Sequence, residues 1–207
     1  MSYECVCPVG YDGFYCNQVV TFTSARFNGK GYLYYELMDY NDLDKTITTL
    51  SFNISTIDNN GMILWMGQPN IDDNTDYLGI GIVDGRVKLS FRLGWLSYGT
   101  LYSDMPVVNG QWHSIIVNRV ETSISLYVDG SPTPVYDIGG EFHELNTDGI
   151  YYIGGFSYNS DVGQLTQQLF LSPFQGCIRD IQVPASYDEL NMMEPHSGAN
   201  VQSCDNN

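Results

Sequence analysis

Residues 76–94, DYLGIGIVDGRVKLSFRLG, decide the fold. Apolar side chains occupy every second position on both sides of the pair Asp84-Gly85: Leu78, Ile80 and Ile82 before it, and Val87, Leu89, Phe91 and Leu93 after it. A period of two predicts a β-strand with one buried face. Asp-Gly between two such runs is typical of a two-residue turn with positive φ at both positions. The stretch therefore predicts an antiparallel hairpin in which Val83 faces Arg86.

The same alternation recurs along most of the chain. Further strands are predicted at residues 50–55, 62–67, 124–128, 150–155 and 177–183. Asp129-Gly130 gives a second hairpin signal. Almost nothing after Val19 is typical of a helix, and no low-complexity linker interrupts the pattern. Many short strands joined by Gly, Asp and Asn turns are typical of a sandwich of two antiparallel sheets. We therefore expect an all-β sandwich, with residues 18–207 forming one domain.

The composition excludes several classes of partner. The 207 residues contain 24 acidic and 8 basic side chains, which gives a net charge of −16. This charge repels nucleic acids and anionic membrane surfaces and favours cations. No apolar run reaches the about 20 residues of a membrane-spanning helix, so we expect no direct membrane insertion. The first residues, MSYEC, lack the pattern of a secretory signal, and we therefore expect the chain to be a piece of a larger protein.

The five cysteines lie near the two ends of the chain. Cys5, Cys7 and Cys16 precede a long cysteine-free stretch, and Cys177 and Cys204 follow it. Zinc binding is the alternative, but the first three cysteines have no histidine nearby and match no zinc-site spacing well. Cysteines at the ends of a large core are typical of disulfides in an oxidising compartment. Their odd number leaves one thiol unpaired.

Residues 4–16, ECVCPVGYDGFYC, contain the pattern CxCPxGYxGxxC. This pattern resembles the C-terminal half of an EGF-like module. The resemblance implies a disulfide between Cys7 and Cys16. It also implies that the partner of Cys5 belongs to an upstream part of the module, which leaves Cys5 unpaired in this chain. We therefore expect residues 1–17 to be the truncated end of an EGF-like module.

Seven segments, in this order and spacing, resemble the laminin G-like domain, also called LNS: TTLSFNIST, GMILWMG, DYLGIGIVDGRVKLSFRLG, NGQWHSIIVNR, ISLYVDG, IYYIGG and FQGCIRDIQV. The likeness covers nearly all of residues 18–207. It implies a jelly-roll sandwich of two antiparallel sheets and a disulfide between Cys177 and Cys204. An EGF-like module joined to such a domain is similar to agrin, perlecan, neurexins, Slit, Crumbs and Fat-type cadherins. The resemblance thus implies an extracellular protein, either secreted into the matrix or part of a cell-surface ectodomain.

The acidic segment 72–76, DDNTD, raises the question of a cation site. In an unbroken hairpin Asp76 faces Leu93, and a carboxylate beside a main-chain carbonyl suits a hard cation. The other ligands are implied by the resemblance alone. Calcium-binding laminin G-like domains also use a carbonyl and an acid from the loop before the YxGG strand, which correspond to the Asn146 carbonyl and Asp148. We expect Ca²⁺ to bind there weakly, at roughly 10⁻⁴–10⁻³ M, with waters completing its about six to eight ligands.

An alternative interpretation of these acids stays open. Many laminin G-like domains lack the ion, and Asp148-Gly149 is also the sequence of an ordinary turn. Asp72 and Asp73 are expected to be solvated in either case.

Two groups of polar and aromatic side chains are candidates for partner contacts. Trp95 and Tyr98 lie in the segment GWLSYGTLY, close to the calcium ligands, and are expected to form an aromatic rim. Packing of these rings on the sandwich edge is the alternative. Arg86, Lys88 and Arg92 share the polar face of one strand. They are either a strip for an acidic partner or sulfated glycan, or simply a solvent face, and the net charge favours the solvent face.

One glycosylation sequon occurs, Asn53-Ile54-Ser55. Asn53 alternates with the apolar side chains of its predicted strand and should therefore face solvent. We expect a glycan on Asn53 if the protein passes through a eukaryotic secretory pathway.

No residue pattern indicates catalysis. Sandwich-fold glycosidases need paired acids that alternate on one strand, and Glu141 and Glu144 do not have that spacing. His113 follows Trp in NGQWH and is interpreted as a core residue. His143 and His196 have no serine or cysteine nucleophile pattern near them. We expect a protein that is not an enzyme.

These features predict a non-catalytic extracellular recognition or adhesion module. It would bind a protein, or a protein that bears a glycan, at a calcium-bearing rim of loops. Two alternatives stay open. The domain is a structural spacer of a larger extracellular protein, or it carries a small apolar ligand between its sheets. An apolar cavity inside the core would favour the carrier.

Overall fold

The computed structural model of the chain describes residues 7–37, 42–70, 76–94, 97–156, 160–184 and 190–204. These residues form short and long strands and one short helix: β1 (Tyr11–Asp12), β2 (Gln18–Val19), β3 (Ser24–Glu36), β4 (Ile47–Ser55), β5 (Gly61–Met66), β6 (Tyr77–Val83), β7 (Arg86–Leu93), β8 (Ser97–Pro106), β9 (Trp112–Val120), β10 (Ser123–Val128), β11 (Ser131–Pro132), β12 (Tyr136–Asp137), β13 (Ile150–Ile153), α1 (Val162–Leu165), β14 (Gln175–Gln182) and β15 (Ser197–Ser203). The all-β class expected from the sequence is confirmed.

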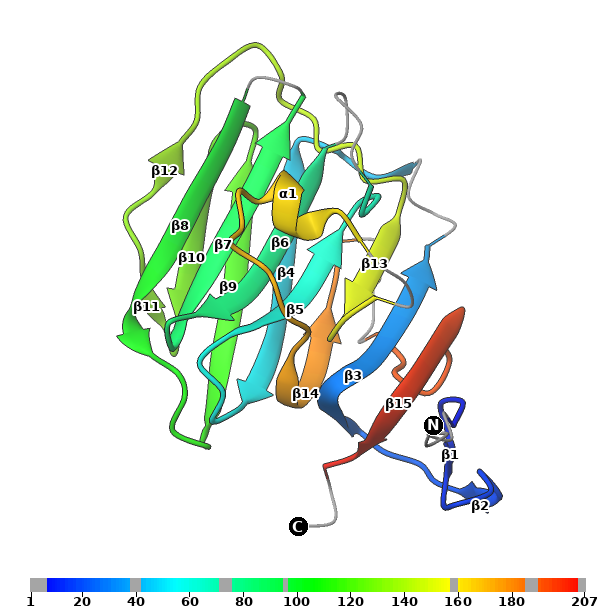
Figure 1. The fold of residues 1–207 in the computed structure, drawn as a ribbon. Helices are drawn as coiled ribbons and strands as arrows, with labels where there is room; N and C mark the ends of the chain where they lie inside the picture. Colours follow the sequence, from blue (N-terminus) through cyan, green and yellow to red (C-terminus); the bar gives the residue numbers. More distant parts are fainter. Residues whose placement is uncertain are drawn as a thin grey trace.

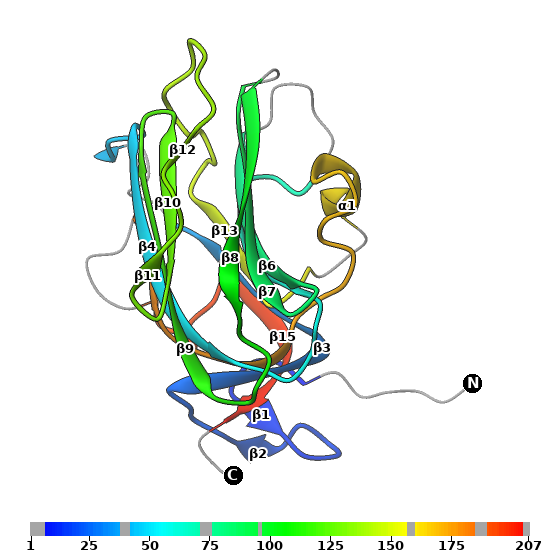
Figure 2. The same ribbon diagram turned by 90° about the vertical axis from the view of Figure 1, so that its left-hand side faces the viewer.

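The strands form two layers that face each other across the core, as Figures 1 and 2 show. Hydrogen bonds join the strands in the order β11-β10-β9-β4-β14-β3-β13-β5-β6-β7-β8, and β15 pairs with β3. The β4, β9 and β10 strands lie in one layer and β6, β7 and β8 in the other (Figure 2). Neighbouring strands are antiparallel. One ladder thus folds over into the expected antiparallel sandwich.

Strand β3 belongs to both layers. Its first half pairs with β14, where Ala25 faces Ile178, and its second half pairs with β13, where Leu33 faces Ile153. Gly31 lies between the two halves, and a Cβ atom there would come 2.4 Å from the main-chain oxygen of Asn200 on β15. Glycine therefore permits the close approach of β15 at the point where the strand changes layer. Alternation did not predict this strand, because its glycines interrupt the pattern.

The hairpin predicted from residues 76–94 is confirmed residue by residue. Val83 faces Arg86, and the pairing continues without a shift to Tyr77 and Arg92. Asp84 and Gly85 have φ angles of 53° and 77°, as the primed turn requires. Asp76 directly precedes Tyr77, so it lies at the open end of the hairpin, as the sequence predicted.

Two apolar clusters stabilise the sandwich. The main core lies between the sheets and includes the alternating side chains of the β6–β7 hairpin. A second cluster lies on the outer face of β5 and β6, where the rings of Trp65 and Tyr77 stack at 4.6 Å and Phe170 packs against them. Helix α1 covers this face (Figure 2). Among the described residues, no helix is long and apolar enough to cross a membrane.

Both expected disulfides are present. Cys7 bonds to Cys16 within the β1–β2 segment, and Cys177 on β14 bonds to Cys204 after β15. The pairing that the two resemblances imply is therefore the pairing in the structure. Cys5 lies outside the described residues. The β1–β2 hairpin lies at the end of the sandwich near β15 (Figures 1 and 2), and the assignment of residues 1–17 to an EGF-like module stays a prediction.

Candidate metal centre

The carboxylate of Asp76 is almost buried at the start of β6, with 5% of the residue exposed. Its main chain passes close to Gly67, where a Cβ atom would come 2.6 Å from the Asp76 carbonyl oxygen. Gly67 has a φ angle of 110°, so glycine permits both the backbone conformation and the close approach. The local sequence thus fixes the acid at the open end of the hairpin.

Three N–H groups bond to this carboxylate. The main-chain N–H of Gly94 donates to Oδ1 at 2.5 Å, and the main-chain N–H of Asn146 donates to Oδ2 at 2.8 Å. The side-chain amide of Asn146 also donates to Oδ2, at 3.3 Å. A carboxylate offers about four lone-pair sites, so these three bonds leave acceptor capacity for a further group. In the described part of the chain, no Lys, Arg or His side chain forms an ion pair with Asp76.

Asp76 and Asn146 open into one cavity of about 500 Å³. Sequence reasoning had linked these two residues, but it missed the other residues that line the cavity: Thr46, Gly94, Glu141, Phe142, His143 and Glu144. The segment 141–144 is exposed and carries two more acids. Nothing in its spacing indicated a site, because the segment reaches Asp76 only through the fold.

Arg119 fixes the two loops beside this cavity. The residue is fully buried on β9. Its guanidinium donates to one hydroxyl and three main-chain carbonyls: Thr48 Oγ1 at 3.1 Å, Glu121 O at 2.7 Å, His143 O at 3.0 Å and Lys45 O at 2.6 Å. A planar guanidinium with five donors can hold several carbonyls in one arrangement. The sequence placed Arg119 inside the NGQWHSIIVNR motif, but it gave no signal for this role.

The other two expected ligands, Leu93 and Asp148, lie at the end of β7 and in the turn before β13. Leu93 ends β7, and its side chain is fully buried, so only its main chain is available to an ion. Asp148 is exposed in a tight turn, with a φ angle of 54° and the N–H of Ile150 donating to Thr147 O at 3.1 Å. Asp148 is not one of the residues that line the cavity. The expected corner therefore contains Asp76 and Asn146, and the structure does not bring Asp148 into its wall.

Comparison with known proteins decides the family. The sequence profile of the laminin G domain matches residues 54–185. The chain belongs to the laminin G domain family. The protein named eyes shut homolog of Pongo abelii is 36% identical over 183 residues, which cover 87% of this chain. The basement membrane proteoglycan of Caenorhabditis elegans is 30% identical over 206 residues, covering 98% of this chain. This chain spans 6% of the length of each of these relatives.

Solved structures confirm the fold of this laminin G domain. Domains LG4-5 of the mouse laminin alpha1 chain match with a TM-score of 0.72 and 19% identity, over 94% of this chain and 47% of that one. Laminin G domains are extracellular, non-catalytic modules. The extracellular location and the absence of enzymatic activity that the sequence predicted are therefore confirmed by the family.

His113 has a structural role in this laminin G domain. Its ring is buried between two side chains, with Nδ1 at 2.7 Å from Asp129 Oδ2 and Nε2 at 2.9 Å from Asn109 Oδ1. Burial raises the pKa of Asp129, but hydrogen bonds from His113 and from the main-chain N–H of Ser114 outweigh it, so the pKa lies below its ordinary value. The ring thus joins the loop before β9 to the turn after β10.

The structure describes part of the expected aromatic rim and all three residues of the basic strip. Tyr98 is 56% exposed on β8, whereas Trp95 lies outside the described residues, as do Asp72 and Asp73. Of the basic strip, Arg86 donates to the carbonyls of Ser103 and Asp104. Arg92 donates from Nε to the carbonyl of Gly94 at 2.8 Å. Two of the three basic groups therefore hold the main chain, which supports the interpretation of this strip as a structural solvent face.

The sequon lies in the middle of the sheet. Asn53 faces Arg179 of β14 on one side and Ser114 of β9 on the other. Its side chain is half-buried on the outer face and donates from Nδ2 to Asp180 Oδ2 at 2.6 Å. A glycan would be attached at this same nitrogen, which keeps one N–H, so its first sugar would lie beside the carboxylate of Asp180. Glycosylation of Asn53 stays a prediction.

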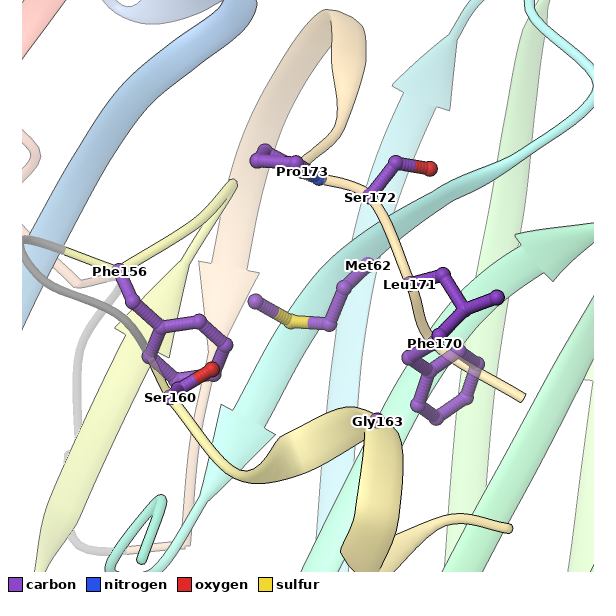
Figure 3. A pocket seen from close by; sticks show the side chains of 8 residues that line it. All are labelled: Met62, Phe156, Ser160, Gly163, Phe170, Leu171, Ser172 and Pro173. Carbon is purple, nitrogen blue, oxygen red and sulfur yellow. The ribbon is translucent and has the colours of Figure 1, made fainter. Parts of the chain in front are cut away.

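An apolar pocket of about 350 Å³ lies on the outer face of the sandwich. Met62 of β5 forms its floor, and Phe156, Phe170 and Leu171 surround it beside α1, as Figure 3 shows. The space between the sheets is instead filled by the side chains of the main core. The pocket therefore does not match the carrier hypothesis, which needs a ligand site between the two sheets.

Proposed function

We propose that this laminin G domain is a recognition module that binds Ca²⁺ at Asp76 and contacts an extracellular protein, or a glycan on one, at the rim beside it. The observation that carries the proposal is the environment of the Asp76 carboxylate. It is almost buried, it is bonded to N–H groups of Gly94 and Asn146, and it has no ion pair with a described basic residue. A buried carboxylate favours a compensating cation.

The donors around the cavity suit a hard cation. Asp76 offers carboxylate oxygens, and main-chain carbonyls of Leu93 and Asn146 are the further candidates. Glu141 and Glu144 add negative charge to the same cavity. Asp148, in the turn before β13, remains a proposed ligand. When bound, the ion would supply a positive charge for acidic or hydroxyl groups of a ligand, and waters would complete its shell.

The rim is placed well for contact with a large partner. The cavity is lined by the exposed segment 141–144, which includes Phe142 with 48% of its surface exposed. An exposed aromatic ring beside a polar cavity is typical of interaction surfaces. The net charge of −16 further disfavours nucleic acid and other polyanions, unless a cation lies between the two surfaces.

Amide chemical shifts test the metal site directly. We expect Ca²⁺ titration to shift the main-chain N–H signals of Gly94 and Asn146 first, because these groups bond to Asp76. The shifts should saturate in the millimolar range and be absent in Asp76→Asn. Asp104→Asn, an exposed acid on β8, should behave as the wild type. Unchanged Gly94 and Asn146 signals at about 10 mM Ca²⁺ would reject the site.

Partner binding separates the recognition module from the spacer. The chain would be applied to decellularised matrix with Ca²⁺ and with a chelator, as wild type, Asp76→Asn and Asp104→Asn. The proposal expects retention that depends on Ca²⁺ and on Asp76. If Asp76→Asn loses Ca²⁺ but is retained equally, the ion only stiffens loops and the spacer hypothesis replaces the rim hypothesis.

A further inference from the structure

Cys7 and Pro8, which precede β1, contact the edge of β15 that is not paired with β3. Pro8 makes an antiparallel bridge to Ala199, and the main-chain N–H of Asn200 donates to the carbonyl of Cys7 at 3.3 Å. The other edge of β15 is paired with β3. An unpaired strand edge presents main-chain donors and acceptors that an extended segment can satisfy. Residues 7 and 8 thus lie as a short added strand beside β15.

The edge of β15 is shaped to receive this segment. Its pairing with β3 shifts between Ala199 and Val201, and the intervening Asn200 has a φ angle of 56°. The extra residues at this shift lie on β3, where residues 28–31 are opposite Asn200 alone. Asparagine tolerates the left-handed conformation better than most residues. Asn200 has no partner in the regular register with β3 at this point, and its N–H donates to the carbonyl of Cys7 instead.

Side-chain packing continues from the same edge. Val9 packs against the main core, although most of the N-terminal hairpin is exposed. A Cβ atom at Gly198 of β15 would come 2.6 Å from Val9 Cγ2. The next residue, Gly10, is buried, and a Cβ atom there would come 3.2 Å from Met193 Cε. The missing side chain at Gly198 therefore makes room for Val9, and the joint has an apolar part as well as hydrogen bonds.

We propose that residues 7–10 dock on β15 and thereby hold the disulfide-linked β1–β2 hairpin as a rigid extension of the laminin G domain. Figures 1 and 2 place this hairpin at one end of the sandwich, whereas the end of β7 and the start of β8 lie at the opposite end. Gly94 directly follows β7. The joint therefore fixes the direction in which the Asp76 rim faces relative to the N-terminal segment. This goes beyond the proposed function and does not depend on a bound ion.

Backbone relaxation and amide exchange of the whole chain test the joint. If it is rigid, residues 7–12 and β15 share the order parameters of ordered backbone, about 0.85. Exchange of the Asn200 N–H, which bonds to the carbonyl of Cys7, should be slow in the wild type. Val9→Ser removes the apolar anchor and should speed this exchange by about tenfold or more, while Ile153 on β13 exchanges as before. Val19→Ser is the matched control, because Val19 lies in the same hairpin and is 76% exposed.

Two outcomes would overturn the proposal. Order parameters below about 0.6 throughout residues 7–20 would show a flexible tether. Equal Asn200 exchange in the wild type and Val9→Ser would show that Val9 does not hold the segment. A uniform acceleration that includes Ile153 would mean general destabilisation, and the milder Val9→Ala variant then decides. Val9→Ala must speed exchange at Asn200 while Ile153 exchanges as before, or the joint is rejected.

Discussion

Oδ2 of Asp76 accepts a hydrogen bond from the main-chain N–H of Asn146 at 2.8 Å, although 70 residues separate the two in the chain. The bond joins the open end of the β6–β7 hairpin to the loop before β13. It brings the carboxylate and the loop that carries Asn146 to the same cavity, where the metal centre is proposed. The stability of that loop should then control the site.

Arg119 is expected to be the main support of this loop. Arg119→Met leaves the carbonyls of Lys45, Glu121 and His143 without their donor and should lower the free energy of unfolding by about 3 kcal/mol. Calcium affinity should fall as well, because the segment 141–146 is released. Urea denaturation and calcium titration measure the two effects.

Lys88→Met is the control for Arg119→Met. It removes a cation from the outer face of β7 and should change the free energy of unfolding by no more than about 0.5 kcal/mol. Equal stability of Arg119→Met and the wild type would show that the guanidinium does not hold the loops.

The Cys177–Cys204 disulfide should stabilise the domain by restricting the unfolded chain. The two cysteines are separated by 27 residues, so replacing both with alanine should cost about 3.5 kcal/mol. Replacing Cys7 and Cys16, which are separated by 9 residues, should cost about 1 kcal/mol less. Urea denaturation of both double variants checks the order. A larger loss of stability on replacing Cys7 and Cys16 would contradict this order. It would indicate that the contacts of the N-terminal hairpin contribute more to the stability than the restriction of the unfolded chain.

Acid should weaken the contact between Asp129 and His113. The pKa of Asp129 is raised by burial but lowered further by its hydrogen bonds from His113 and Ser114, so it is lower in the folded than in the unfolded protein. A lowered carboxyl pKa contributes stability above the unfolded value of about 3.9, and this contribution is lost as the pH falls through the folded value. The stability difference between the wild type and Asp129→Asn should therefore be larger at pH 6 than at pH 3.

Thermal or urea unfolding at the two pH values measures this difference. Asp104→Asn serves as the exposed control on β8 and should change the stability little at either pH. A stability difference between the wild type and Asp129→Asn that is equal at the two pH values, or larger at pH 3, would contradict the predicted direction of the pH dependence.

The sequence predicted those features that depend on local patterns. Alternation and Asp84-Gly85 defined the β6–β7 hairpin, and with it the position of Asp76 beside the end of β7. Residues Cys177 and Cys204 were paired by the resemblance to the laminin G-like domain. These predictions succeeded because period-two burial and two-residue turns are set by nearest neighbours in the chain.

The remaining features depend on contacts between distant segments. The cavity beside Asp76 includes Thr46 and Glu144, which no spacing in the sequence relates to each other. The buried guanidinium of Arg119 is similarly explained only by the carbonyls that the fold brings around it. Asp148 occupies the expected position in the sequence and lies in an exposed turn, and its role as a ligand stays a prediction.

Calorimetric titration with Ca²⁺ tests the central claim most directly. The wild type and Asp104→Asn should give saturable heats with a dissociation constant in the range of roughly 10⁻⁴–10⁻³ M, as in other extracellular modules. Asp76→Asn keeps the shape of the side chain but removes its charge, and it should give no such heat. Absence of heat in the wild type at millimolar Ca²⁺, or equal binding by Asp76→Asn, would contradict the account.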